Sequence, residues 1–276
     1  MGKRADAIFG SNLFLHYTIT VDYLRQRAVF TASSAETRSQ GTPIPIQIFG
    51  DVPFAEATIQ GEDGEKVSGL FFVDSGTTGA MVLNRKFLDA HPHLIAKAHF
   101  VDSPTVTAVG GKIHSSRAQI PQVGIGPFVF SNVVAAMPDS SVGVLSNESV
   151  AGIIGAGVLR RFTVTWDYAR KRMFLLPNRR LKEPFETDCS GLHLVSPGPE
   201  YHAIMIDSVL SGSPGALAGL TTGDQIIAVN GTRGLPVWKV AETLRQAGRS
   251  ARLAVHRKAS VLEVKLLLRS PFLPAT

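Results

Sequence analysis

The residues most able to do chemistry lie in the stretch 71–84, FFVDSGTTGAMVLN, where one carboxylate follows an apolar run. Asp74 ends that run, and Ser75, Gly76 and Thr77 come directly after it. Burying a carboxylate in an interior is costly unless hydrogen bonds compensate, and glycine and hydroxyl residues offer close N–H and O–H donors. A short Asp-Ser-Gly sequence is also common in surface turns. The stretch therefore allows two interpretations, a polar turn or a catalytic carboxylate held in a hydrogen-bonded loop.

Two later segments favour the catalytic interpretation. The glycine pair Gly110 and Gly111 comes first, and an apolar run that contains Ile153 and Ile154 then ends at Gly155. In their order and spacing, these segments and the Asp-Ser-Gly triplet resemble the retropepsin-like aspartic proteases of bacteria. The resemblance implies that Gly110 and Gly111 tip a flap hairpin that closes over a peptide and excludes water. It also implies that Ile153, Ile154 and Gly155 form an apolar-glycine turn behind the active-site loop.

The same resemblance, which covers residues 44–177, implies that Asp74 is catalytic and that Ser75, Gly76 and Thr77 support its loop. Two carboxylates a few ångströms apart cannot both ionise, so the members of such a dyad share a proton. One then acts as a base toward water while the other donates a hydrogen bond to the scissile carbonyl. We therefore expect an aspartic endopeptidase that hydrolyses a polypeptide substrate without a cofactor or a metal.

The second carboxylate of this dyad is not evident in the sequence. Asp74 belongs to the one Asp-Ser/Thr-Gly triplet of the chain, and both Asp22 and Asp167 stand in Asp-Tyr pairs between strand-like runs. Two sources remain open. A second copy of the chain could supply the acid in a homodimer, as in retropepsin-like proteins, or a first repeat could supply it within one polypeptide.

A self-comparison makes the second source realistic. Residues 7–30, AIFGSNLFLHYTITVDYLRQRAVF, align with residues 152–175, GIIGAGVLRRFTVTWDYARKRMFL, at a constant offset of 145. The pairs of identical residues include Gly10 with Gly155, Thr18 with Thr163, Thr20 with Thr165, Asp22 with Asp167, Tyr23 with Tyr168, Arg25 with Arg170 and Arg27 with Arg172. Because the second copy ends a module, the first copy resembles the end of another module.

The last third of the chain has its own pattern. Residues 204–231, IMIDSVLSGSPGALAGLTTGDQIIAVNG, contain strand-like runs, glycine turns and one short helical segment, and they closely resemble a PDZ domain. PDZ domains bind an extended peptide as an added strand and hold its terminal carboxylate with loop N–H groups. The resemblance assigns peptide binding to Leu192, His193, Leu194 and Val237. Because His193 replaces the usual central glycine of the carboxylate-binding loop, the ligand is a peptide C-terminus or an extended segment, and packing against the protease alone is a further alternative.

Turn residues divide the chain throughout. Short apolar runs separated by Gly, Pro or Asp predict strands, with 85–90 as the main helical candidate before residue 156. The predicted fold class is mainly β, a retropepsin-like closed β-barrel module followed by a small α+β PDZ domain. The predicted organisation is the end of a first protease-like repeat plus a linker at 1–40, the protease domain at 41–178, a linker at 179–190 and the PDZ domain at 191–270.

Composition argues against several other classes of protein. The chain has 28 Lys and Arg against 22 Asp and Glu, but the basic residues are scattered without interleaved aromatics, so no nucleic-acid partner is expected. The single cysteine, Cys189, excludes an intramolecular disulfide and a cysteine metal cluster. His91, His93 and His99 lack an acidic partner in the local sequence and are expected at the surface.

No apolar run is long enough to predict a transmembrane segment, and the first residues do not read as a signal peptide. Export to the periplasm is therefore suggested by the resemblance alone. Two functions stay open at this point. The first is an aspartic endopeptidase whose PDZ domain positions the substrate. The alternative is a non-catalytic peptide-binding protein that uses its PDZ domain, with a protease fold that is inactive without a partner Asp.

Overall fold

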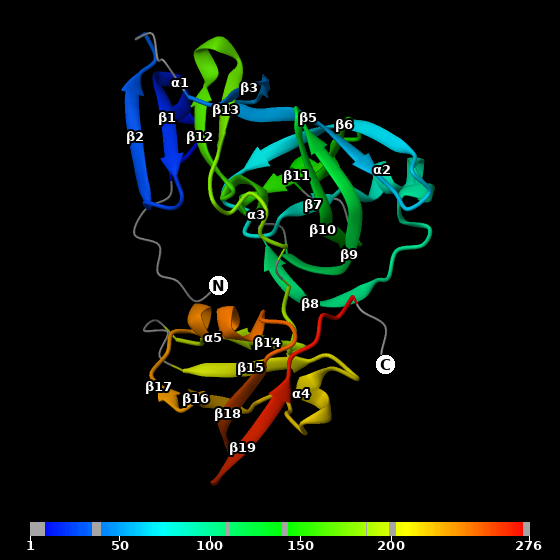
Figure 1. Ribbon diagram of the computed structural model, residues 1–276, viewed down its shortest axis with the longest axis vertical. Coiled ribbons are helices and arrows are strands. Elements are labelled where there is room, and N and C mark those ends of the chain that lie inside the picture. Colours follow the sequence, from blue (N-terminus) through cyan, green and yellow to red (C-terminus); the bar gives the residue numbers. More distant parts are fainter. Residues whose placement is uncertain are drawn as a thin grey trace. The chain divides into compact units, whose positions relative to one another are not determined.

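The computed structural model describes residues 9–34, 40–108, 111–139, 143–185, 187–198 and 203–272. The chain forms two compact units, of which one is Ile8–Phe185 and the other contains Glu186–Thr276 (Figure 1). The division between them falls inside the stretch 179–190 that the sequence predicts to be a linker.

The larger sheet of the first unit closes on itself. Its strand order is β4-β5-β6-β11-β7-β10-β9-β8, and β5 also pairs with β9, so the strands from β5 to β9 in this order form a ring. Neighbours are antiparallel except for β6 with β11 and β7 with β10. The strands are β4 (Gln47–Phe49), β5 (Val52–Gln60), β6 (Lys66–Asp74), β7 (Met81–Leu83), β8 (Val101–Ala108), β9 (Gly111–Ile125), β10 (Phe128–Pro138) and β11 (Val150–Gly155). The expectation of a closed, mainly β module is confirmed.

Short helical segments interrupt this barrel where turn residues break the strand pattern. Helix α2 (Arg85–Ala90) lies at the predicted helical position, and the Asn84 side chain caps it by accepting a hydrogen bond from the Lys86 N–H. Two 3₁₀ segments follow, η1 (Pro92–Ile95) and η2 (Gly143–Ser146).

A second sheet of the first unit joins the N-terminal residues to the end of the barrel module. Its order is β2-β1-β12-β13-β3. The strands are β1 (Tyr17–Asp22), β2 (Arg27–Ala32), β3 (Thr42–Pro45), β12 (Phe162–Asp167) and β13 (Arg172–Pro177), accompanied by α1 (Asn12–His16), α3 (Ala156–Leu159) and η3 (Tyr168–Arg170). The two copies of the sequence repeat therefore pair directly, through β1 and β12.

The second unit is a small sheet with two helices. The strand order is β14-β15-β16-β18-β19, with β17 also paired to β16, which leaves β14 at one edge among the described residues. The elements are β14 (Leu192–Val195), β15 (Ile204–Val209), α4 (Pro214–Leu217), β16 (Gln225–Val229), β17 (Thr232–Arg233), α5 (Val237–Leu244), β18 (Ser250–Arg257) and β19 (Ser260–Leu267).

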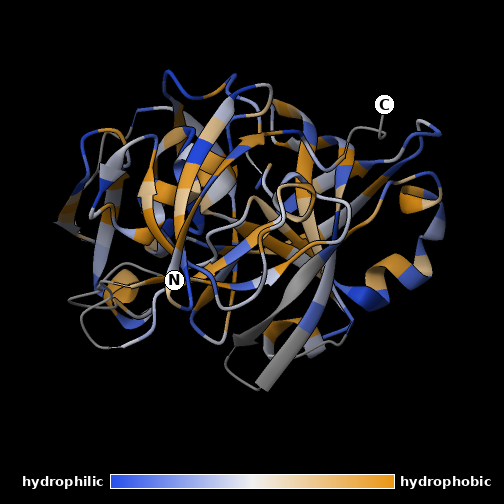
Figure 2. Cartoon of the chain, turned by 90° about the horizontal axis from the view of Figure 1, so that it is seen from below, coloured by the Kyte–Doolittle hydropathy of each residue, from blue (hydrophilic) through white to orange (hydrophobic). Residues whose placement is uncertain are grey.

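Each unit has its own hydrophobic core, as the alternation of apolar and polar residues along the strands requires. Phe71, Ile120 and Ile154 are among the fully buried side chains of the barrel, and Leu253 and Val255 of β18 lie in the core of the second unit. Apolar residues are concentrated on the strands, and hydrophilic ones mostly on the connecting segments (Figure 2). Among the described residues, no helix has both the length and the hydropathy needed to cross a membrane.

Candidate active site

Asp74 is the last residue of β6, and its own loop holds the carboxylate. The backbone N–H of Gly76 donates to Asp74 Oδ1 over 2.8 Å, and the Thr77 hydroxyl donates to Oδ2 over 2.7 Å. Each carboxylate oxygen accepts one of these bonds, which orients the carboxylate and leaves lone pairs for a water or a second acid. A Cβ on residue 76 would lie 3.1 Å from Asp74 Oδ1, so glycine allows this close approach.

The surroundings of Asp74 are more open than the sequence suggested. The side chain is half-buried, and Ser75 and Gly76 are exposed, because the strand ends at Asp74 and the loop leaves the core. The apolar run places the acid at the edge of the interior rather than within it. A partner acid or a substrate can therefore reach the carboxylate.

Strand β11 forms the frame behind this loop. Gly155 pairs with Asp74 in parallel register, and three consecutive backbone N–H groups donate to carbonyl oxygens of the loop. A Cβ on residue 155 would lie 2.3 Å from the Gly79 carbonyl oxygen and 2.8 Å from that of Thr77, so only glycine fits without a shift. The three bonds are Gly155 N to Ala80 O (2.9 Å), Ala156 N to Thr77 O (2.7 Å) and Gly157 N to Gly79 O (2.9 Å).

The prediction that Ile153, Ile154 and Gly155 form a turn is wrong. They are the last residues of β11, paired with Phe72, Val73 and Asp74 of β6, and the chain then enters α3. Ile154 is fully buried in the barrel core. A strand results because both of its edges find partners, β6 on one side and β7 on the other.

The predicted flap is only partly described. Gly110 lies outside the described residues, and Gly111 is the first residue of β9, opposite Ala108 of β8. Strands β8 and β9 form an antiparallel hairpin between Asp74 and β11 in the chain. The role of its glycines as a flap tip stays a prediction.

The two other acids considered in the sequence have structural partners. Asp22 accepts hydrogen bonds from the N–H groups of Leu24 and Arg25, and the backbone bond from Arg25 is the main cause that lowers the pKa of its carboxyl. Asp167 is fully buried and pairs with Arg170 and Arg172. Each carboxylate stabilises the turn that follows its own strand.

Tyr23 is a residue near Asp74 that the sequence analysis did not single out. Burial raises the pKa of its phenol, and the negative charge of Asp74 raises it further. The hydroxyl is buried and has no hydrogen-bond partner among the residues that the structure describes. The repeated Asp-Tyr pair was the available signal, but a sequence repeat does not show that the first copy reaches toward Asp74.

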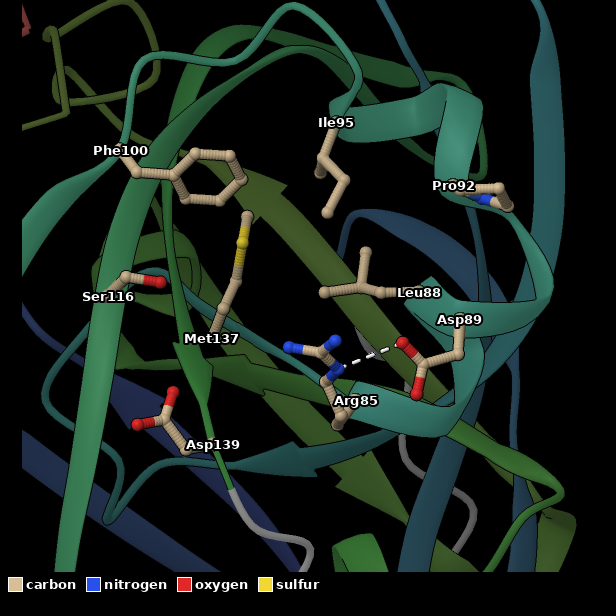
Figure 3. Close-up of a pocket in the computed structure, with 9 residues that line it drawn as sticks. All are labelled: Arg85, Leu88, Asp89, Pro92, Ile95, Phe100, Ser116, Met137 and Asp139. Atoms are coloured by element: carbon tan, nitrogen blue, oxygen red, sulfur yellow. Dashed lines mark hydrogen bonds and ion pairs between the residues drawn. The ribbon is translucent and has the colours of Figure 1, made fainter.

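A separate pocket of about 260 Å³ opens elsewhere on the barrel unit. Figure 3 shows Leu88, Ile95, Phe100 and Met137 around its apolar part. Polar groups lie on its other side, where Arg85 pairs with Asp89 over 2.8 Å. The Asp74 loop does not line this pocket, so the pocket is distinct from the candidate active site.

His93 has an acidic partner that its local sequence does not show. The loop between β5 and β6 brings Glu65 Oε2 to 3.2 Å from His93 Nε2, and the possible ligand atoms of Asp63, Glu65 and His93 all lie within 4.8 Å of one another. Both carboxylates are exposed. Glu65 contacts the His93 ring within this cluster, although the two residues are distant in sequence.

In the second unit, β14 offers an open edge for an extended peptide, and it contains three of the predicted peptide-binding residues. Leu192 is buried in the core, His193 pairs with Asp207 at 3.1 Å, and Leu194 is half-buried. Val237 of α5 is also a core residue, with 6% of its surface exposed. Strand β14 and helix α5 are in contact.

The loop before β14 already binds a carboxylate of its own chain. Asp188 accepts hydrogen bonds from the N–H groups of Ser190 and Gly191 and from the Ser190 hydroxyl. The Leu192 N–H donates to the Ser190 hydroxyl oxygen. These consecutive donors are therefore engaged before any peptide carboxylate arrives.

Comparison with known proteins gives the most direct support to the assignment of the second unit. A family model described as a PDZ domain matches residues 205–257, so the expected PDZ domain is confirmed there. No curated protein matches the chain.

Solved structures similar to parts of this chain include two proteases and one PDZ domain. A photosystem II D1 C-terminal processing protease is 23% identical, with a TM-score of 0.27 over 29% of this chain and 22% of its own. This chain thus spans about a fifth of that protein. The HtrA3 PDZ domain bound to a phage-derived ligand is 20% identical, with a TM-score of 0.26 over 29% of this chain and 84% of its own. A retropepsin-like aspartic protease from Rickettsia conorii is 19% identical, with a TM-score of 0.33 over 51% of this chain and 96% of its own.

Proposed function

We propose that the first unit is an aspartic endopeptidase in which Asp74 is one member of a carboxylate dyad. The observation that carries the proposal is the Asp74 carboxylate, held by hydrogen bonds at the end of β6. Strand β11 packs so closely behind its loop that residue 155 has no space for a side chain. A surface turn would need neither this second strand nor the bonds from it. The arrangement favours the catalytic interpretation over the polar turn.

The chemistry requires a second carboxylate facing Asp74. In the ground state the two acids share one proton, and the ionised member takes a proton from a bound water as the oxygen of that water attacks the scissile carbonyl. The protonated member donates its hydrogen bond to the carbonyl oxygen, and a proton then passes to the leaving amine. The bonds from Gly76 and Thr77 keep the Asp74 carboxylate in place during both transfers.

The PDZ domain would position a polypeptide substrate by strand addition along β14. Because Asp188 engages the N–H groups of Ser190 and Gly191 and adds negative charge beside β14, we expect the ligand to be an extended segment rather than a terminal carboxylate. A peptide-binding protein without turnover is the second candidate function. The PDZ match favours it independently of Asp74.

The test compares Asp74→Asn with the unchanged chain on an unfolded polypeptide at acidic pH. We expect cleavage to fall at least a hundredfold, since the amide cannot share the dyad proton. Asp89→Asn, which changes an exposed acid in the same unit, is the matched control and should cleave normally. Equal cleavage by the Asp74→Asn variant would rule out the aspartic mechanism, and peptide binding without any cleavage would favour the second candidate.

A further inference from the structure

The sequence repeat is also a structural repeat with local two-fold symmetry. Strand β1 pairs antiparallel with β12, and Thr20 lies opposite Thr165, its own equivalent at the offset of 145. The two hydroxyl oxygens are 2.8 Å apart. Exchange of the two copies maps the pair Ile19–Trp166 onto the pair Val21–Val164 and the pair Thr20–Thr165 onto itself, so a local two-fold axis passes between Thr20 and Thr165.

Details of the two hairpins repeat as well. Gln26 and Lys171 are equivalent positions, and both have left-handed backbone conformations, with φ of 52° and 49°. The Arg25 and Arg170 guanidinium groups pair with their own Asp22 and Asp167 carboxylates at 3.2 Å. These equivalences were not needed to pair the strands, so they support a common origin of the β1–β2 and β12–β13 hairpins.

The environments of the two copies differ sharply in burial. Three apolar side chains of the first copy are exposed, whereas their equivalents in the second copy are buried in the barrel core. We call Phe9, Tyr17 and Phe30 the aromatic face. Their exposed fractions are 64%, 40% and 40%, against 0%, 0% and 1% for the equivalents Ile154, Phe162 and Leu175.

The barrel itself accounts for this difference. The ring of Phe162 packs against those of Phe128 and Phe130 on β10, at centroid distances of 4.8 and 6.1 Å. Its equivalent Tyr17 contacts Phe30, another member of the aromatic face, at 6.2 Å. Likewise β3 covers the outer edge of β13, while β2 ends the sheet among the described residues. In the β12–β13 hairpin, these apolar positions pack against the barrel. In the β1–β2 hairpin, no barrel among the described residues covers them.

From this asymmetry we infer that the aromatic face is the docking surface for a β-barrel module related to residues 41–151, placed by the axis between Thr20 and Thr165. Resting on the proposed function, the inference also names the source of the second carboxylate. The docked module presents its own Asp-Ser/Thr-Gly loop opposite Asp74. A second copy of this chain does not fit, since its barrel is already covered by its own β12–β13 hairpin and the β12 edge is occupied by β1.

The first test asks which strands pair, using the full chain with its one cysteine removed by Cys189→Ser. Oxidation of the Thr20→Cys/Thr165→Cys variant should give a disulfide within one chain, which runs as a monomer on a non-reducing gel. Thr165→Cys alone should give no covalent dimer. A Thr165→Cys dimer would overturn the inference, because it would place the β12 strands of two copies against each other.

The second test supplies such a barrel module as a probe. A copy of residues 41–151 is joined ahead of residue 7 of the full chain, which restores the repeat spacing. Maleimide labelling of Phe30→Cys should then slow at least tenfold relative to the original chain. The control is Ala32→Cys, which should label at the same rate in both chains because Ala32 and its equivalent Pro177 are both exposed.

Unchanged labelling of residue 30 in an extended chain that still forms the 20–165 disulfide would overturn the docking inference. Cleavage separates this outcome from the proposed function. If residue 30 is protected but the extended chain does not cleave polypeptides in an Asp74-dependent way, the docking stands and the aspartic endopeptidase is wrong.

Discussion

Substitution of Gly155 by alanine tests most directly whether β11 holds the Asp74 loop. The added methyl group would lie 2.3 Å from the Gly79 carbonyl oxygen, about 0.9 Å inside an ordinary carbon–oxygen contact of about 3.2 Å, and 2.8 Å from the Thr77 carbonyl oxygen. Relief requires the loop to move away from β11. That movement lengthens the bonds that join residues 155–157 to the loop, which are now 2.7 to 2.9 Å long.

The expected cost follows from these contacts. Overpacking costs about 1–3 kcal/mol, and weakening two or three backbone hydrogen bonds adds about 1 kcal/mol each. Alanine also reduces the conformational entropy of the unfolded chain, which stabilises the folded protein by somewhat less than 1 kcal/mol. We therefore expect the free energy of unfolding of the barrel unit to fall by about 2–5 kcal/mol. Since a displacement of about 1 Å at a catalytic group can lower activity about a hundredfold, cleavage should fall by a similar factor.

The assay is urea unfolding followed by the fluorescence of Trp166, which is buried in the barrel unit. A Trp238→Phe background removes the other tryptophan, which lies in the PDZ unit. Gly79→Ala is the matched control, because a Cβ at that position meets no atom within 4 Å. The bracing role of β11 would be refuted if the two variants had free energies of unfolding within 0.5 kcal/mol of each other and cleaved the polypeptide equally well.

Three further outcomes are expected. Asp224 is fully buried and accepts two hydrogen bonds of 2.7 Å from Arg257, which are the main cause that lowers the pKa of its carboxyl. Asp224→Asn should destabilise the PDZ unit by about 2–3 kcal/mol at pH 7. Because the folded-state pKa is the lower one, the Asp224 contribution is present above the unfolded value near 3.8 and disappears as the pH falls through the folded value, so urea unfolding at pH 7 and below pH 3 should differ. Tyr23→Phe removes a buried hydroxyl without a partner and should leave the free energy of unfolding unchanged or raise it by up to about 1 kcal/mol, and a loss beyond that would reveal an unrecognised partner. Peptides selected on the PDZ unit should lose less than about threefold in affinity when their C-terminus is amidated, since Asp188 engages the loop, and a loss of tenfold or more, about 1.4 kcal/mol, would show carboxylate capture.

Local chemistry explains how much of the site was predictable from sequence. The apolar run before Asp74 predicts a strand that ends in a polar loop, and glycine and threonine after it provide the donors that the structure shows. The turn predicted at Ile153–Gly155 is a strand, because strand formation depends on partner edges that are about 80 residues away in the chain. The pairing of Glu65 with His93 likewise depends on a contact between a loop and a 3₁₀ segment that no sequence window contains.

The sequence by itself determined the mainly β fold class, the PDZ pattern and the repeat between residues 7–30 and 152–175, since each depends on residue type and periodicity. Only the tertiary structure decided that the two copies pair across a local two-fold axis, that Asp74 is open at its edge, and that one copy buries its apolar face while the other exposes it. The physical reason is that burial depends on what packs against a face. Equivalent apolar positions of the two copies therefore differ in exposure where a barrel covers one copy and not the other.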